Sequence, residues 1–169
     1  MHRSRRSTRG VVLIEYLVTL PLLIILLVGL CDCAQLVLLQ AQVDHLTREA
    51  GNLASRGTKI DDTWNLLLQQ QTPLTFETDG QMIFSVVTRA SDVDDRPVVD
   101  DQRTFGGQSY VTSRVGSVGG PASIPGITSL APGVLMVVVE SAYRYQPLIE
   151  PPAFTQITFP EFVSEIAYF

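Results

Sequence analysis

The stretch RGVVLIEYLVTLPLLIILL, residues 9–27, decides the fold, because it is a long apolar run with one carboxylate near its start. Val11 to Cys31 is a run of 21 residues in which Glu15 is the only side chain charged at neutral pH. A helix of this length spans a bilayer core of about 30 Å. Pro21 lies inside the run and predicts a mild kink, which membrane helices tolerate better than soluble ones. We therefore predict a single membrane-spanning helix.

Four arginines precede this run and set its orientation. Arg3, Arg5, Arg6 and Arg9 lie in the first ten residues, which contain no acidic residue. Without those ten residues Lys+Arg falls from 12 to 8, Asp+Glu stays at 17, and the formal charge changes from -5 to -9. Because a basic flank stays in the cytoplasm, the remainder of the chain is expected to be exported. Its acidic charge repels phosphate backbones, which excludes nucleic acid as a partner.

The helix is predicted to continue beyond the membrane as an amphipathic segment. Its apolar positions recur at spacings of three and four residues, which places them on one face. These positions are Leu36, Leu39, Val43, Leu46, Ala50 and Leu53. Arg56 and Gly57 form a stop signal in which the glycine can take the left-handed cap. The apolar face is expected to pack on the chain's own sheet, and a coiled coil with a partner helix is the alternative.

A short second helix is predicted next. Asp61 or Asp62 could provide its N-cap, since carboxylates accept hydrogen bonds from the free N–H groups of a first turn. The helix would run through Trp64 and Leu66–Leu68, which form a core patch, and would end before Pro73.

The remaining residues predict an antiparallel sheet. Strands are expected at 81–90 and, most strongly, at 133–148, with a weaker strand at 109–118. The acidic stretch 91–107 and the stretch 116–133, rich in glycine and proline, are expected to be loops. The predicted fold class is therefore α+β, with a long N-terminal helix and a small antiparallel sheet packed on the exported half of that helix.

The leader, the glycine and the glutamate together form a pattern. Gly10 ends the basic leader, and Glu15 stands at the fifth place after it. This pattern resembles the class III signal sequence of type IV pilin-like precursors, which a membrane prepilin peptidase cuts between Gly10 and Val11. The segments EYLVTLP (15–21), DHLTREAGNLASRG (44–57) and VVVESAYRYQPL (137–148) resemble parts of the TadE/TadF-like pseudopilins of tight-adherence systems.

The resemblance is specific over the first 57 residues and is absent over 58–132. Val11 stands where archetypal type IV pilins have phenylalanine, and Pro21 falls much earlier than the proline of their helix. Both departures fit the tight-adherence branch.

The resemblance implies a pilin-like fold and four parts of the chain. These are a leader of residues 1–10 that is removed, a transmembrane helix of 11–31, an amphipathic extension of 32–57, and an extracytoplasmic α+β domain of 58–169. The implied location is the bacterial inner membrane, with the N-terminus in the cytoplasm and the C-terminal domain in the periplasm, and after assembly a surface pilus. The implied partners are other pilin-like subunits, the prepilin peptidase, an inner-membrane pilus assembly platform and membrane lipid.

Cleavage after Gly10 would explain the carboxylate in the apolar run. An unpaired acid at the bilayer centre costs at least about 2.5–3.5 kcal/mol. The freed α-amine of Val11 is positively charged at neutral pH and lies one helical turn before Glu15. The two charges offset each other's desolvation, either within one subunit or between neighbours. Between subunits only one axial offset pairs them, so the pair would set register. Tyr16 and Pro21 complete the predicted assembly segment.

Three features of the sequence each allow two interpretations. Glu15 is alternatively a stray acid in a plain signal anchor. Cys31 and Cys33 point in different directions on a helix, so they are interpreted as small buried hydrophobes, with an intersubunit disulfide as the alternative. The acidic stretch 91–101 is interpreted as a solvated loop, and because it lacks the EF-hand spacing it is only a weak calcium candidate. The candidate ligands are Asp92, Asp94 and Asp95.

No catalytic constellation is present in the sequence. His2 and His45 are the only histidines, and neither a phosphate loop nor a metal-binding histidine pair occurs. We therefore expect no enzyme activity, no cofactor and no metal. The first hypothesis is a processed minor pilin or pseudopilin of a tight-adherence pilus or secretion machine. The second is a single-pass anchored periplasmic binding module that never enters a filament.

Overall fold

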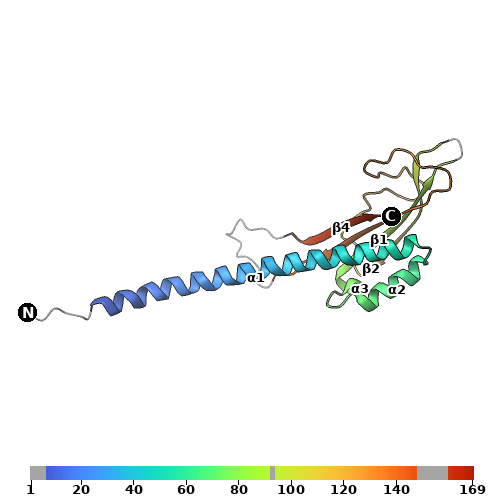
Figure 1. Cartoon of the computed structure of the whole chain (residues 1–169). Coiled ribbons are helices and arrows are strands. Elements are labelled where there is room, and N and C mark those ends of the chain that lie inside the picture. Colours follow the sequence, from blue (N-terminus) through green and yellow to red (C-terminus); the bar gives the residue numbers. More distant parts are fainter. Residues whose placement is uncertain (1–6, 92–93, 148–159) are drawn as a thin grey trace, which may run out of the picture. The chain divides into compact units, whose positions relative to one another are not determined.

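The computed structural model describes residues 7–91, 94–147 and 160–169 (Figure 1). Its elements follow the order α1 (Ser7–Ser55), α2 (Ile60–Gln70), α3 (Phe76–Asp79), β1 (Gly80–Arg89), β2 (Pro97–Gly106), β3 (Met136–Arg144) and β4 (Phe162–Tyr168). This order confirms the predicted α+β class. The chain divides into two compact units, and their boundary within α1 lies between Leu38 and Leu39.

Helix α1 ends where the sequence predicts. Gly57 takes the left-handed conformation with φ +88°. Its N–H donates to the carbonyl of Ala54 at 3.1 Å, and the N–H of Thr58 donates to the carbonyl of Leu53 at 3.3 Å. These bonds satisfy carbonyls of the last turn that have no partner within the helix. The predicted glycine cap is therefore confirmed.

The four strands form one antiparallel sheet in the order β2-β1-β3-β4. Phe84 of β1 lies opposite Arg103 of β2 and Val139 of β3. The register of β1 against β2 shifts between Val86 and Val87, which leaves one extra residue in β2, Asp100. Such a bulge increases the local twist and disturbs the ladder at that point. Strands β2 and β3 are not neighbours, so the chain between them must cross β1.

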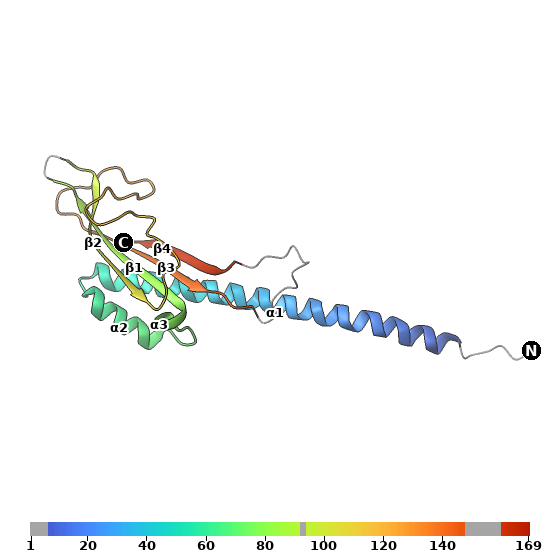
Figure 2. The ribbon, with the colours of Figure 1, turned by 180° about the vertical axis from the view of Figure 1, so that it is seen from behind.

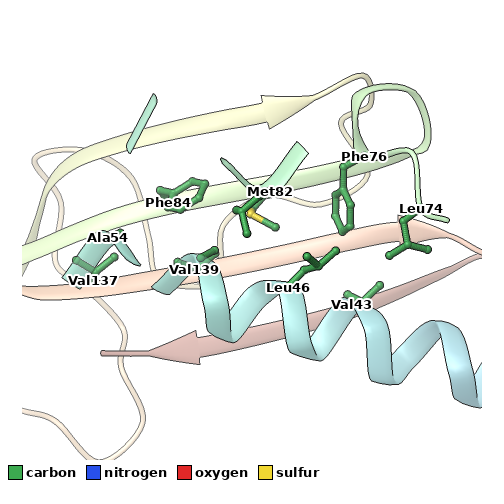
Figure 3. Close-up of a cluster of buried hydrophobic side chains, with 11 residues drawn as sticks. Val43, Leu46, Ala54, Leu74, Phe76, Met82, Phe84, Val137 and Val139 are labelled. Carbon is green, nitrogen blue, oxygen red and sulfur yellow. The ribbon is translucent and has the colours of Figure 1, made fainter. Parts of the chain in front are cut away.

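One face of the sheet packs against the C-terminal part of α1 and against α2. Alternate side chains point to this face, as the period of a strand requires. The buried cluster comprises Val43, Leu46, Ala50 and Ala54 of α1, Leu67 of α2, Leu74, Phe76, Met82 and Phe84, and Val137 and Val139 of β3 (Figure 3). Trp64 of α2 stacks on Phe105 of β2 with ring centroids 5.2 Å apart. Burial of each large apolar side chain contributes about 1.5–3 kcal/mol.

The connection 107–135 covers the opposite face of the sheet (Figure 2). A second apolar cluster lies beneath it, formed by Val87, Val99 and Val138 of the strands and by Val115, Ile124 and Leu130 of the connection. The connection contains no helix and no strand of its own among the residues described between Gly106 and Met136. Its backbone groups therefore need partners other than a regular ladder.

Polar side chains from β1 and β2 supply part of those partners. Gln81 of β1 bonds both backbone groups of Val111: its Nε2 donates to the carbonyl and its Oε1 accepts from the N–H, each at 2.8 Å. Gln102 of β2 donates through Nε2 to the carbonyl of Gly116 at 3.1 Å and to the hydroxyl of Ser85 at 2.8 Å.

Strands β3 and β4 bind the same segment. Glu140 of β3 is 4 % exposed and accepts from the hydroxyl of Ser113 and from the N–H of Arg114, the latter at 2.8 Å. The guanidinium of Arg114 donates to the hydroxyl of Ser164 in β4 at 2.7 Å. Each of the four strands thus contributes one polar side chain to segment 111–116.

Two sequence predictions for this domain are wrong. Residues 97–106 were expected within a loop but form β2. The charged side chains of this edge strand face solvent and α2. One of them, Arg103, forms a 2.8 Å ion pair with Asp61. Residues 109–118, expected as a weak strand, are irregular, and several of their backbone groups bond to side chains of the sheet instead of to a neighbouring strand.

Three further details differ from the expected elements. The N-cap position of α2 is Lys59, without a side-chain cap bond, so Asp61 and Asp62 lie in the first helical turn instead. Helix α3 and strand β4 were not predicted.

Candidate functional site

The N-terminal part of α1 carries an apolar surface that the described chain leaves exposed. Between Val12 and Leu30 most large side chains are more than half exposed, and Val37 and Leu38 extend this surface. A helix satisfies its own backbone hydrogen bonds, which is what a hydrocarbon environment demands. By length and composition this is the one described helix that could cross a membrane.

Glu15 and its neighbours lie near the start of that surface. Glu15 is exposed, and so is Tyr16 at 68 %. The hydroxyl of Thr19 donates to the backbone carbonyl of Glu15 at 2.7 Å, so this polar side chain is satisfied within the helix. Pro21 has no N–H, so the carbonyl of Leu17 loses its usual donor. The carboxylate of Glu15 is thus the charged group that the apolar surface presents.

The predicted processing position lies about one helical turn before Glu15. Gly10 and Val11 belong to the helical backbone of α1. Val11 precedes Glu15 by four residues, which is about 6 Å along a helix axis and on the same face. An amine created at Val11 would therefore lie beside the carboxylate. Arg3, Arg5 and Arg6 of the predicted leader lie outside the described residues.

The predicted packing face lies in the C-terminal part of α1. Val43, Leu46 and Ala50 are in the core, and Leu39 packs partly against it. Leu36 and Leu53 are half-buried.

The helix also buries residues outside the predicted face, among them Ala54 and Thr47. Ala54 joins the core, and Thr47 is 1 % exposed. The hydroxyl of Thr47 donates to the carbonyl of Val43 and is also hydrogen-bonded to the hydroxyl of Ser141 in β3. The sequence alone does not show that a threonine beside an apolar face will be buried and hydrogen-bonded to the sheet.

Cys31 and Cys33 are exposed thiols without a disulfide. The interpretation as buried small hydrophobes is therefore wrong for this chain. An intersubunit disulfide stays a prediction.

Asp94 of the acidic loop is paired with an arginine. Arg96 binds both carboxylate oxygens of Asp94, with its Nη2 2.6 Å from Oδ2, and this contact lowers the pKa of Asp94 to about 2. Asp92 lies outside the described residues, and no cluster of three metal-ligating side chains occurs among those that are described. The carboxylate of Asp94 is therefore engaged by a guanidinium.

Neither strand β4 nor the groove beside it was predicted from the sequence. The strand lies at the edge of the sheet, beside a groove lined by α1. The aromatic and β-branched content of residues 162–168, with Phe162, Val163 and Ile166, was the signal that could have revealed a strand here.

Comparison with known proteins matches one part of the chain. Residues 10–52 match the family model described as TadE-like protein, which confirms the resemblance found in the sequence. No curated protein and no solved structure matches the chain. The matched segment covers most of α1, with Gly10, Glu15 and Pro21 inside it. Residues 10–52 are thus similar to the TadE-like family, and the helix that contains them is long and apolar enough to cross a membrane.

Proposed function

We propose that this chain, whose N-terminal segment matches the TadE-like family, is a processed minor pilin of a tight-adherence pilus or secretion machine. A prepilin peptidase cuts after Gly10, and Glu15 then pairs with the new amine of Val11 to set subunit register. The single observation that carries the proposal is the exposed apolar helix with its one carboxylate a turn beyond a glycine.

Electrostatics supports this pairing. The carboxylate of Glu15 is exposed on α1, with no ion-pair partner among the side chains described. In lipid such a group costs at least about 2.5–3.5 kcal/mol. A cationic amine one turn away, on the same or a neighbouring helix, lowers that cost. Because the partner is created by cleavage, assembly depends on processing.

Removal of the leader also changes how the helix is held. The four arginines of residues 1–10 anchor the N-terminus at the cytoplasmic face before cleavage. After cleavage the helix can leave the bilayer and join other pilin-like subunits on an inner-membrane platform. The proposed topology therefore places the C-terminal domain in the periplasm.

The pairing is tested by Glu15→Gln, which keeps the shape and removes the charge. We expect normal membrane insertion and normal cleavage but at least about tenfold less protein in the assembled fraction, the factor that a loss of about 1.4 kcal/mol produces. Glu15→Asp is the matched control, because it keeps the charge with a shorter side chain and should retain part of the assembly. Equal assembly of Glu15→Gln and wild type would disprove the pairing.

Processing is tested separately by Gly10→Ala and bulkier substitutions, with N-terminal sequencing of the mature chain. We expect the wild-type chain to begin at Val11 and a bulky variant to keep its leader. A wild-type chain that still begins at Met1 would contradict processing. A cleaved chain that is never recovered in sheared surface fractions would instead support the anchored periplasmic binding module.

A further inference from the structure

Strand β4 presents one open side. The N–H and carbonyl of Val137 bond to Phe169 at 2.9 Å each, and the N–H of Tyr145 bonds to the carbonyl of Glu161 at 3.0 Å. In an antiparallel ladder these groups alternate in direction along a strand. The odd-numbered residues of β4 therefore bond to β3, and the even-numbered residues point their backbone groups outward. These are Phe162, Ser164, Ile166 and Tyr168.

The opposite edge of the sheet is protected, whereas β4 is not. Val99 of β2 exchanges backbone bonds with Gly119 and Gly120, at 2.8 Å and 3.1 Å, so the connection covers the start of that edge. A bulge at Asp100 and the charged Arg103 interrupt the rest. These are the devices by which natural sheets prevent unwanted pairing. For β4, no pairing on the outer side occurs among the described residues.

A groove of about 710 Å³ lies beside this open edge. One face of α1 lines it, from Ala41 to Asn52, together with the end of β4 from Ile166 onward. Gly51 permits this arrangement, because a Cβ there would lie 2.2 Å from the ring of Phe169. A strand added beyond β4 would direct every second side chain into the groove.

The charges of the groove indicate what those side chains should be. Arg48 is paired with Asp44 at 2.7 Å, whereas Glu49 has no ion-pair partner among the described side chains. Glu165 points to the same face of the sheet, and its charge helps to raise the pKa of Arg48, although Asp44 is the main cause. Asp44 and Glu49 of the lining, together with Glu165 near Arg48, thus outnumber the guanidinium of Arg48 and the imidazole of His45, which is the other titratable lining group. Side chains entering the groove should therefore be basic.

The other face of the added strand meets different neighbours. Residues of the added strand that lie opposite Ile166 and Tyr168 would be on the sheet face that the connection 107–135 covers. On this face Ile166 touches the second apolar cluster. Cross-strand pairs of apolar and aromatic side chains stabilise such positions. The complementary segment therefore alternates basic and apolar residues.

We propose that the outer side of β4 binds an extended segment of another polypeptide, in which basic and apolar residues alternate, as a fifth strand of the sheet. A second copy of this chain fits poorly. Its own free edge contains Glu165, its other edge is blocked, and the chain beyond residue 10 carries a formal charge of -9. The inference does not depend on cleavage or on Glu15.

The test uses the full chain in a neutral detergent and a synthetic peptide that alternates lysine and valine. Amide hydrogen exchange is measured residue by residue along β4. We expect saturating peptide to slow exchange at Phe162, Ser164, Ile166 and Tyr168 by at least about tenfold, because main-chain pairing protects these amides. The odd-numbered amides, which already bond to β3, should change little. A matched peptide with glutamate in place of lysine should bind at least about fivefold more weakly.

Two variants separate strand addition from other kinds of binding. Ser164→Pro removes an outward N–H without removing a bond to β3, and it should abolish peptide binding. Ser164→Ala is its matched control, because both variants lose the bond to Arg114, and it should bind normally. Glu49→Lys lies in the groove and touches no strand backbone. It should weaken the lysine peptide about fivefold and strengthen the glutamate peptide.

Three results would overturn the proposal. The first is an unchanged exchange rate at the even-numbered amides of β4. The second is equal binding of the peptide by Ser164→Pro and Ser164→Ala, or equal binding of the lysine and glutamate peptides. The third is protection of the same amides without peptide as protein concentration rises, since the occupant would then be a second copy of this chain.

Discussion

The two faces of the sheet are covered in different ways. The face under α1 and α2 is closed almost entirely by apolar side chains, with Phe84 and Val139 fully buried at its centre. The face under the connection 107–135 has a smaller apolar cluster and a set of polar side chains, one from each strand. The difference follows from the covering layer and not from the sheet.

A helix and an irregular segment make different demands on a sheet. Helix α1 satisfies its own backbone groups, so the sheet needs only to offer it apolar surface. The connection has no such internal ladder, and its N–H and carbonyl groups would remain unpaired if only valines faced them. Gln81, Gln102 and Glu140 supply those bonds. We conclude that the polarity of a strand face reports the regularity of the layer that covers it.

The largest effect is expected on the helix-covered face. Phe84→Ala removes a fully buried ring that meets Phe105 edge-on at 5.7 Å, and should lower the free energy of unfolding by about 3–5 kcal/mol. The measurement is urea unfolding of the full chain in a neutral detergent. Leu66→Ala on the exposed side of α2 is the matched control and should cost less than about 1 kcal/mol. Similar losses for the two variants would refute the assigned core.

An intermediate effect is expected on the connection-covered face. Glu140→Ala leaves the N–H of Arg114 and the hydroxyl of Ser113 without their acceptor and should cost about 1–3 kcal/mol. Glu140→Gln keeps an acceptor for the N–H and should cost less. Hydrogen exchange would sharpen the comparison, because Glu140→Ala should raise exchange mainly in segment 111–116. A uniform increase across α1 as well would show that the two faces do not behave separately.

The smallest effect is expected at the exposed ion pair of Asp94 with Arg96, which lies between β1 and β2. Asp94 has a pKa of about 2 because Arg96 binds its carboxylate, whereas an unfolded aspartate has a pKa of about 3.9. The stabilisation is therefore present above about pH 4 and is lost as the pH falls toward 2. Arg96→Ala should raise the pKa of Asp94 toward its ordinary range, while the N–H of residue 96 still donates to the carboxylate, and should change stability little because the pair is exposed. A carboxyl titration by NMR measures this shift, and an unchanged pKa would contradict the assigned cause.

The helix-covered face was largely predictable from the sequence. The spacing of Val43, Leu46 and Ala50 marks one helical face, and the valine-rich stretch that becomes β3 marks a buried strand. Glu15 was selected as a candidate because a charge in an apolar run has few structural explanations, and its role stays a prediction. In each case a local pattern corresponds directly to a local structure.

The connection-covered face was not predictable in the same way. Gln102 and Asp101 made the stretch that becomes β2 resemble a loop, because polar residues in a strand have no signature that separates them from turn residues. The roles of Gln81 and Glu140 depend on partners 30 and 26 residues away, which no short window reveals. The edge position of β4 likewise depends on strand order, which is a property of the whole sheet.

The anchors of segment 111–116 also constrain how the domain reaches its folded state. Because the bond from Arg114 ends on Ser164 in the last of the four strands, the segment cannot dock completely until β4 has joined the sheet. Contacts between residues so distant in the chain close late, since the loop entropy must be overcome first. Until β4 joins the sheet, the second apolar cluster therefore lacks its contact with Ile166, and the guanidinium of Arg114 lacks its partner Ser164. The cover of this face of the sheet is thus complete only after the strand that comes last in the chain order has joined the sheet.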